Sequence, residues 1–319
     1  MLPRTAPRVF LALAILSVVG QAGAQPIPRA ANFRTGTRMV LVPVTVTDHY
    51  GKTITGLQAK DFKLFDDQAP QQIVSFGTQD APCSAGLVLD ISGSMQSTLG
   101  VVKEGAQAFV REANQEDEFL LLTVSTQPAA SPSFTADAGN VEESIALIRP
   151  GGFTALIDTV HLGLTQMRRG RNPQRALIVV SDGMDNHSRY SKAELLRDAL
   201  EADVQIYTII VDNGAGGVTP NSVPFRPSMI AKPGDQGVAR QGPMLLEELA
   251  EKTGGLSFHV RSAAEAKEGM AKIGQALRNE YVIGYQPAES ETSGKLHRIH
   301  VKSTVPKVTV HARSGYYAP

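Results

Sequence analysis

The 319-residue sequence has a single cysteine, no tryptophan and no net charge. The lone Cys83 cannot form a disulfide within the chain, so stability must come from a packed core and from any bound metal. The 31 basic residues balance 31 acidic ones, which gives the protein no general attraction for nucleic acid or an anionic membrane. An aromatic content of 6% also disfavours a surface on which nucleobases stack. The composition therefore favours an ordinary globular protein of one or two domains.

Long apolar runs are also scarce, and the strongest one lies near the N-terminus, where residues 9–20 read VFLALAILSVVG. This run is too short to span a bilayer, follows Arg4 and Arg8, and precedes the small residues AGA at 22–24. A buried N-terminal helix is the alternative, but the order of these three parts predicts a signal peptide at 1–24. Residues 25–36 are expected to form a linker. We expect an exported protein, periplasmic or extracellular, with no transmembrane segment after the signal.

Both ends of the mature chain show the two-residue periodicity of β-strands. Residues 37–80 include TRMVLVPVTVTD, in which valines alternate along one face. Residues 281–319 repeat the pattern in YVIGYQP, HRIHVKS and KVTVHARSGYY. Neither region has many strands by itself, so we expect both to form one small β-sandwich-like domain.

The region between them, residues 82–280, alternates strand and helix patterns. Apolar strands are predicted at the ranges 85–91, 119–124, 176–181, 204–211 and 256–260. Helical stripes with three- and four-residue spacing are predicted at the ranges 99–113, 156–167, 245–250 and 266–277. Runs such as LIVV are typical of parallel strands that helices cover on both faces. The prediction is a doubly wound α/β domain inserted into the β-domain, with a long Gly/Pro-rich loop at 213–242 of unassigned role.

Oxygen-bearing side chains gather at the predicted carboxyl ends of these strands. DISGSM supplies Asp90, Ser92 and Ser94 after one strand, and SDGMDN supplies Asp182 after another. GGFTAL supplies Thr154 before a helix. Ser, Asp and Gly are also ordinary turn and helix-cap residues, so one such loop alone is weak evidence. Three such loops at one sheet edge favour a metal site.

The predicted ligands, Asp90, Ser92, Ser94, Thr154 and Asp182, are all hard oxygens. The set contains no histidine or cysteine, which argues against zinc and favours Mg²⁺ or Mn²⁺. The two carboxylates balance the charge of a divalent ion, and the hydroxyls are neutral, so the ligand set carries little negative charge beyond what the ion needs. An ion reached by one carboxylate through water would stay electrophilic and accept a carboxylate from a partner.

Residues 82–275 resemble a von Willebrand factor type A domain, because those three loops match its metal-ion-dependent adhesion site (MIDAS). The flanking segments resemble those of a bacterial secreted subfamily. The resemblance implies that the five residues hold a metal directly or through water, and that the module binds a partner protein in adhesion. It also implies that the last helix of the domain can shift when the site is occupied.

Two other functional classes remain open from the residues. The metal could only brace the loops of a structural envelope protein. A secreted hydrolase would need a base and an orienting group for Ser94, but DISGSM is not a G-x-S-x-G nucleophile motif. His187, near the site, is expected to be a polar loop residue. We therefore expect no enzymatic activity, and the partner protein is not specified by the sequence.

We predict that the exported protein begins at Gln25. Signal peptidase cleaves after small residues that follow a short apolar run, and the AGA sequence lies at that position. N-terminal sequencing of secreted material should give Gln25 as the first residue. An intact Met1 on that material would contradict the prediction.

Overall fold

The computed structural model describes residues 39–212, 235–287 and 294–318, with only the backbone for 235–241. The predicted signal peptide at 1–24 and the linker at 25–36 lie outside the described residues. Most of the predicted loop at 213–242 lies outside them too. These three assignments stay predictions.

The middle of the chain forms a six-stranded sheet in the order β10-β9-β8-β5-β6-β7. All neighbours pair in parallel except β6 and β7, which are antiparallel. Sequence periodicity predicted the five parallel strands, and it missed β7 because that strand has only two residues. The strands are β5 (Cys83–Asp90), β6 (Glu118–Val124), β7 (Ala129–Ala130), β8 (Gln174–Ser181), β9 (Gln205–Val211) and β10 (Ser257–Val260).

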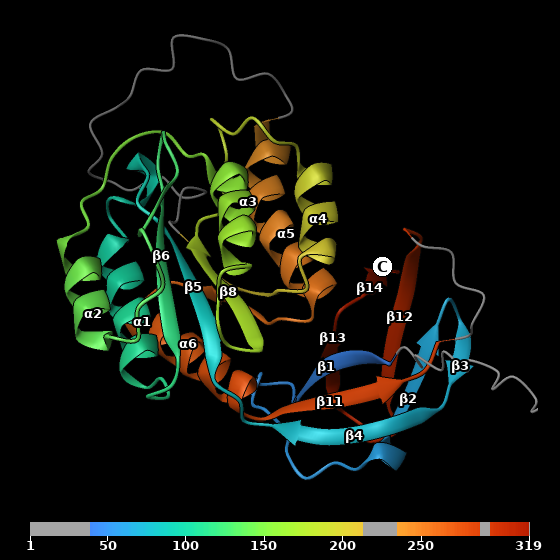
Figure 1. The fold of residues 1–319 in the computed structure, drawn as a ribbon. Helices are drawn as coiled ribbons and strands as arrows, with labels where there is room; N and C mark the ends of the chain where they lie inside the picture. The colour runs from blue at the N-terminus through green and yellow to red at the C-terminus, as the bar shows by residue number, and fades with distance from the viewer. Residues whose placement is uncertain (1–38, 213–234, 288–293, 319) are drawn as a thin grey trace, which may run out of the picture. The chain divides into compact units, whose positions relative to one another are not determined.

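Helices cover both faces of this sheet (Figure 1). One apolar cluster joins the sheet to α1, α2 and α6, and a second joins it to α3, α4 and α5. The helices are α1 (Leu99–Arg111), α2 (Ala138–Leu147), α3 (Leu156–Met167), α4 (Lys192–Glu201), α5 (Asp235–Thr253) and α6 (Ala263–Arg278). The mixed α/β fold with a mostly parallel sheet is confirmed.

Two of these helices, α2 and α4, are absent from the sequence prediction. Each buries only two side chains in its middle, so neither has a long apolar stripe. Their starts do carry local signals. Asp137 accepts a hydrogen bond from the backbone N–H of Asn140, and Ser191 and Glu194 form a capping box.

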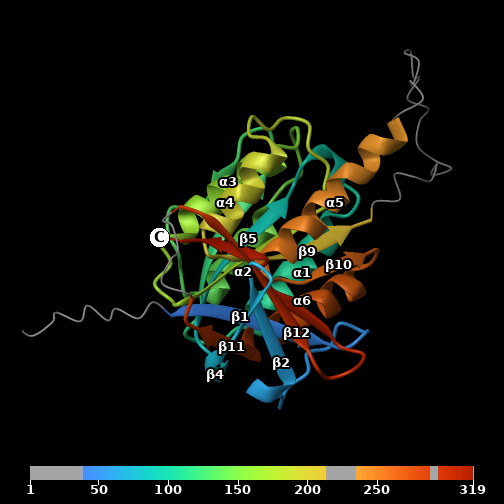
Figure 2. The same cartoon turned by 90° about the vertical axis from the view of Figure 1, so that its right-hand side faces the viewer.

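The chain ends form two four-stranded sheets, in the orders β13-β1-β11-β4 and β14-β12-β2-β3. Figure 2 shows strands of one sheet crossing those of the other. Their facing side chains, among them Val44 and Ile283 from the first sheet and Leu64 and Val301 from the second, share one apolar core. The strands are β1 (Val40–Thr47), β2 (Phe62–Asp66), β3 (Ala69–Gln71), β4 (Ile73–Gln79), β11 (Glu280–Tyr285), β12 (Leu296–Ser303), β13 (Thr309–Ala312) and β14 (Gly315–Tyr317).

The two ends of the chain meet strand by strand. β1 pairs antiparallel with β11 and with β13, and β4 pairs with β11 on its other side. The register places Gln79, where β4 ends, opposite Glu280, where β11 begins. The α/β part therefore leaves and re-enters this sheet at adjacent positions. The exact domain boundaries stay predictions.

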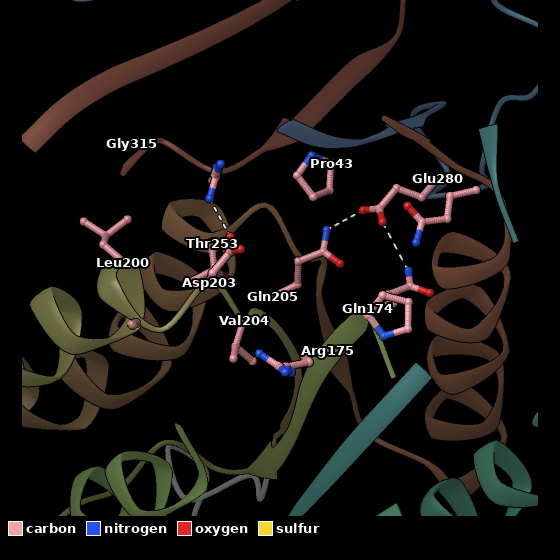
Figure 3. A pocket seen from close by; sticks show the side chains of 14 residues that line it. Pro43, Gln174, Arg175, Leu200, Asp203, Val204, Gln205, Thr253, Glu280 and Gly315 are labelled. Atoms are coloured by element: carbon pink, nitrogen blue, oxygen red, sulfur yellow. Dashed lines mark hydrogen bonds and ion pairs between the residues drawn. The ribbon is translucent and has the colours of Figure 1, made fainter. Parts of the chain in front are cut away.

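A polar cavity of about 90 Å³ lies where the α/β part meets the β-sheets (Figure 3). The side-chain amides of Gln174 and Gln205 donate hydrogen bonds to the buried Glu280 carboxyl. Gln174 also donates to the carbonyl of Leu277 in the last turn of α6. Burial raises the pKa of Glu280 to about 7, against the hydrogen bonds from both glutamines, which lower it.

We predict that Glu280→Gln stabilises the protein above neutral pH. Because the pKa of Glu280 is raised in the folded state, its contribution to the free energy of unfolding is fully present below about pH 4.5. That contribution is lost as the pH rises to about 7. The loss is on the order of 3 kcal/mol. A neutral amide has no charge to desolvate and so avoids this loss.

Urea unfolding at pH 5 and pH 8 measures this effect. Wild type should lose stability between the two pH values, whereas Glu280→Gln should lose much less. Glu116→Gln, which neutralises an exposed carboxyl, should behave as wild type. A pH dependence that is unchanged in Glu280→Gln would rule out this carboxyl as its source.

Candidate metal-binding site

The predicted metal ligands lie in loops at the carboxyl edge of the parallel sheet. Asp90 is the last residue of β5, and its carboxyl group is fully buried. The neighbouring strand β8 ends at Ser181, directly before Asp182, and the register pairs Leu89 with Val180. Asp90 therefore ends one strand, and Asp182 directly follows the strand beside it, which places both at the sheet edge expected from the sequence.

The first loop, residues 91–95, turns back over the end of β5. The backbone N–H of Ser92 donates to Oδ1 of Asp90 at 2.9 Å, and the Oγ atoms of Ser92 and Ser94 are 3.1 Å apart. A short 3₁₀ turn, Gly93–Met95, follows, and the Met95 side chain is buried in the core beneath it. The buried methionine fixes the loop while Ser94 stays exposed.

The second loop, residues 151–155, is joined to the first by two backbone hydrogen bonds. Gly151 N–H donates to Ile91 O at 2.7 Å, and Gly93 N–H donates to Gly152 O at 3.0 Å. Gly152 has φ +88°, and a Cβ there would lie 2.7 Å from Oγ1 of Thr126. This position therefore requires glycine.

The third loop, residues 182–188, is joined in turn to the second. Thr154 N–H donates to Oδ1 of Asn186 at 3.0 Å, and the N–H groups of Asn186 and His187 both donate to Thr154 O. Ile157 N–H donates to Oδ2 of Asp185 at 2.8 Å, which ties the start of α3 to the same loop. The three loops thus form one hydrogen-bonded surface, with Ser92 and Thr154 buried and Asp182 half-buried within it.

The charges at this surface suit a cation. Burial raises the pKa of Asp90 to about 6, hydrogen bonds from Ser181 and Ser92 lower it, and the negative charge of Asp182 raises it. Two carboxylates, those of Asp90 and Asp182, therefore lie within one another's electric field. Carboxylate and hydroxyl oxygens from three loops form the hard donor set that Mg²⁺ and Mn²⁺ prefer. The residues present fit a divalent ion.

Three residues that support this surface were missed by the sequence prediction. Ser181 donates its hydroxyl to Oδ2 of Asp90 at 2.5 Å and accepts from Gly183 N–H. Asn186 holds the backbone of the second loop, and Asp185 holds the start of α3. Their signal was present in SDGMDN, where only Asp182 was chosen, because nothing in a sequence says which loop backbone a side chain will reach.

A second group of possible metal ligands lies between the β-sheets, where Asp66, Asp67 and His297 approach one another. Their acceptors are already engaged. Tyr285 donates its hydroxyl to Asp66 at 2.7 Å, and Lys295 pairs with Asp67 at 2.9 Å. A lysine ammonium at this position competes with a metal ion, so the group is better explained as a polar link between strands.

Within the described residues, no helix has the length and apolar character needed to cross a membrane.

A family model matches the first half of the α/β part. Residues 86–184 match the family described as von Willebrand factor type A domain. No curated protein matches the chain.

Solved structures resemble the fold at low identity. The von Willebrand factor type A protein from Catenulispora acidiphila is 10% identical, covers 90% of this chain and 75% of its own, and gives a TM-score of 0.50. The vWF domain of the type V pili tip protein Mfa5 from Porphyromonas gingivalis is 14% identical. The match covers 62% of this chain and 95% of that domain, with a TM-score of 0.47. Proximal thread matrix protein 1 from the mussel byssus, with a zinc-occupied MIDAS motif, is 15% identical. The match covers 68% of this chain and 50% of that chain, with a TM-score of 0.47.

We predict that Ser181→Ala destabilises the protein in metal-free buffer by about 1–3 kcal/mol. The substitution removes a donor to the buried Asp90 and leaves the Gly183 N–H without its acceptor. Urea unfolding in EDTA measures the loss. Ser97→Ala changes an exposed serine near the same loop and should have no effect. Equal stability of the two variants would show that Ser181 does not support Asp90.

Proposed function

Because residues 86–184 match the von Willebrand factor type A domain family, we propose that this chain binds a partner protein through a divalent metal ion. The proposed ligands are Asp90, Ser92, Ser94, Thr154 and Asp182. The ion is Mg²⁺ or Mn²⁺, and when bound it supplies a Lewis-acidic position for an oxygen ligand. The partner contributes an acidic side chain to that position.

One observation supports this proposal above the others: backbone hydrogen bonds unite the three ligand-bearing loops at the sheet edge. The bonds between Gly93 and Gly152, and between Thr154 and Asn186, set the loops in register through contacts of the protein itself. The protein's own contacts therefore help to organise the donor positions, which lowers the entropy cost of ion binding.

The same bonds disfavour a metal that only braces the loops. Bracing matters most where loops lack other connections, and here each neighbouring pair already shares backbone hydrogen bonds. Asp90 does favour a stabilising role for the metal, because a buried carboxylate next to Asp182 destabilises the fold and a bound cation would offset that cost. A structural envelope role stays the alternative, and the experiments below separate the two.

Hydrolysis is disfavoured by the contacts of the groups that would perform it. The Ser94 hydroxyl lies against the hydroxyl of Ser92, whereas His187 stacks its ring on Phe153 and donates its backbone N–H to Thr154. A serine nucleophile needs a base within hydrogen-bonding reach, and no such pair is formed between His187 and Ser94 in the described residues. We therefore propose a binding protein and not an enzyme, exported by the predicted signal peptide.

We predict that Mg²⁺ raises the melting temperature of wild type and not of Asp90→Ala. A ligand that binds only the folded state stabilises it by mass action, about 2.7 kcal/mol at one hundred times its dissociation constant. Thermal unfolding with and without Mg²⁺ or Mn²⁺ measures the shift. Glu116→Gln, which removes a negative charge elsewhere, should shift as wild type does. Equal shifts in wild type and Asp90→Ala would contradict the assignment of Asp90 as a metal ligand.

Partner binding provides the second part of this test. A pull-down with immobilised wild type should capture the partner in Mg²⁺, and EDTA or Thr154→Ala should release it. A metal that shifts the melting temperature while binding survives EDTA would favour the structural role instead.

A further inference from the structure

Two large apolar side chains lie beside the candidate metal ligands and face solvent. Phe153 directly precedes Thr154 and is 61% exposed. Met184 lies two residues after Asp182 and is 39% exposed, and its N–H donates to the Asp182 carboxylate. The second and third loops thus each present an apolar group next to a proposed ligand.

The exposed position of Phe153 is fixed by its surroundings. Gly152 takes a backbone conformation that only glycine adopts readily, and Phe153 N–H donates to Oγ1 of Thr126 at 2.9 Å. The Phe153 ring then stacks on His187, with ring centroids 5.4 Å apart and planes at 21°. The ring is held at the surface on a second exposed ring, and does not fold into the core.

We propose that this face recognises a partner loop in which the acidic residue is flanked by a large apolar side chain. The inference rests on the proposed function, because the metal is what positions the partner's carboxylate. Phe153 and Met184 then determine specificity by contacting the neighbouring apolar group. Large apolar side chains are depleted from open surfaces and enriched where partners bind.

Charge complementarity supports this choice of partner. The loops carry the carboxylates of Asp90 and Asp182, so a partner's carboxylate is favoured at the position of the proposed cation. Arg189, the residue that follows the third loop, pairs with the buried Asp158. Further acidic groups on the partner would be repelled by these carboxylates, whereas a carboxylate beside an apolar side chain matches the proposed cation and the exposed Phe153 and Met184.

A series of small carboxylates tests the proposal: acetate, butanoate and hexanoate, with hexan-1-ol as the probe that lacks a carboxylate. Binding to the full protein in Mg²⁺ is measured by saturation-transfer NMR titration. Each methylene that leaves water contributes about fourfold in affinity, so partial burial predicts hexanoate to bind roughly tenfold more tightly than acetate. Hexan-1-ol should bind no better than acetate.

The variants assign this gain to particular side chains. Phe153→Ser and Met184→Ser should reduce hexanoate affinity to nearly that of acetate while leaving acetate binding and the Mg²⁺ thermal shift unchanged. Phe153→Leu should retain most of the gain. Val74→Ser removes an exposed apolar group on β4 and should keep wild-type affinities.

Failures of the two proposals are distinguishable. If acetate binding does not depend on Mg²⁺ and Asp90, the proposed function itself is wrong and the inference falls with it. If acetate binds through the metal but affinity does not rise with chain length, or if the rise persists in both serine variants, the apolar recognition is wrong and the metal-dependent function stands.

Discussion

The antiparallel pairing of β11 with both β1 and β4 is the constraint on which the rest of the structure depends. It joins segments more than 200 residues apart in sequence and closes the core shared by both β-sheets. It also brings the two ends of the α/β insertion to adjacent positions, since Gln79 lies opposite Glu280. The parallel sheet can then complete all its crossovers between two fixed points, and its carboxyl edge lies away from this attachment.

This arrangement restrains α6, the helix that the family resemblance would allow to shift on ligand binding. Its last turn is bonded to the first residue of β8 through Gln174 and Leu277. Arg278 donates to Glu112 O and pairs with Asp117, and Glu280 follows after a single residue. A shift of the whole helix would break these contacts and perturb the Glu280 site at once. Coupling therefore requires a second arrangement of comparable free energy, which ligand binding would have to favour.

Long-range periodicity made the fold predictable from the sequence, and local chemistry at the site was predictable only in part. The strands ending at Asp90 and Ser181 have continuous apolar runs, so their place in a parallel sheet followed directly. Short α2 and α4 bury too little to show a stripe. Ser181 and Asn186 could not be selected as supports for Asp90 and Thr154, because those contacts join loops that no periodicity links. The group of Gln174, Gln205 and Glu280 is equally invisible, since its members meet only after the insertion has closed.

The two edges of the parallel sheet each bury a carboxyl group, and they stabilise it in opposite ways. Glu280 accepts hydrogen bonds from two neutral amides and lies in a small polar cavity. Its raised pKa means that it avoids a buried negative charge by taking up a proton. Asp90 receives a hydroxyl and a backbone N–H, and the carboxylate of Asp182 adds a second negative charge. A cation at that edge would offset the negative charges of both Asp90 and Asp182. The causes of the raised Glu280 pKa, in contrast, include no second carboxylate. The asymmetry is what makes the carboxyl edge, and not the polar cavity, the better candidate for a metal-dependent contact with a partner.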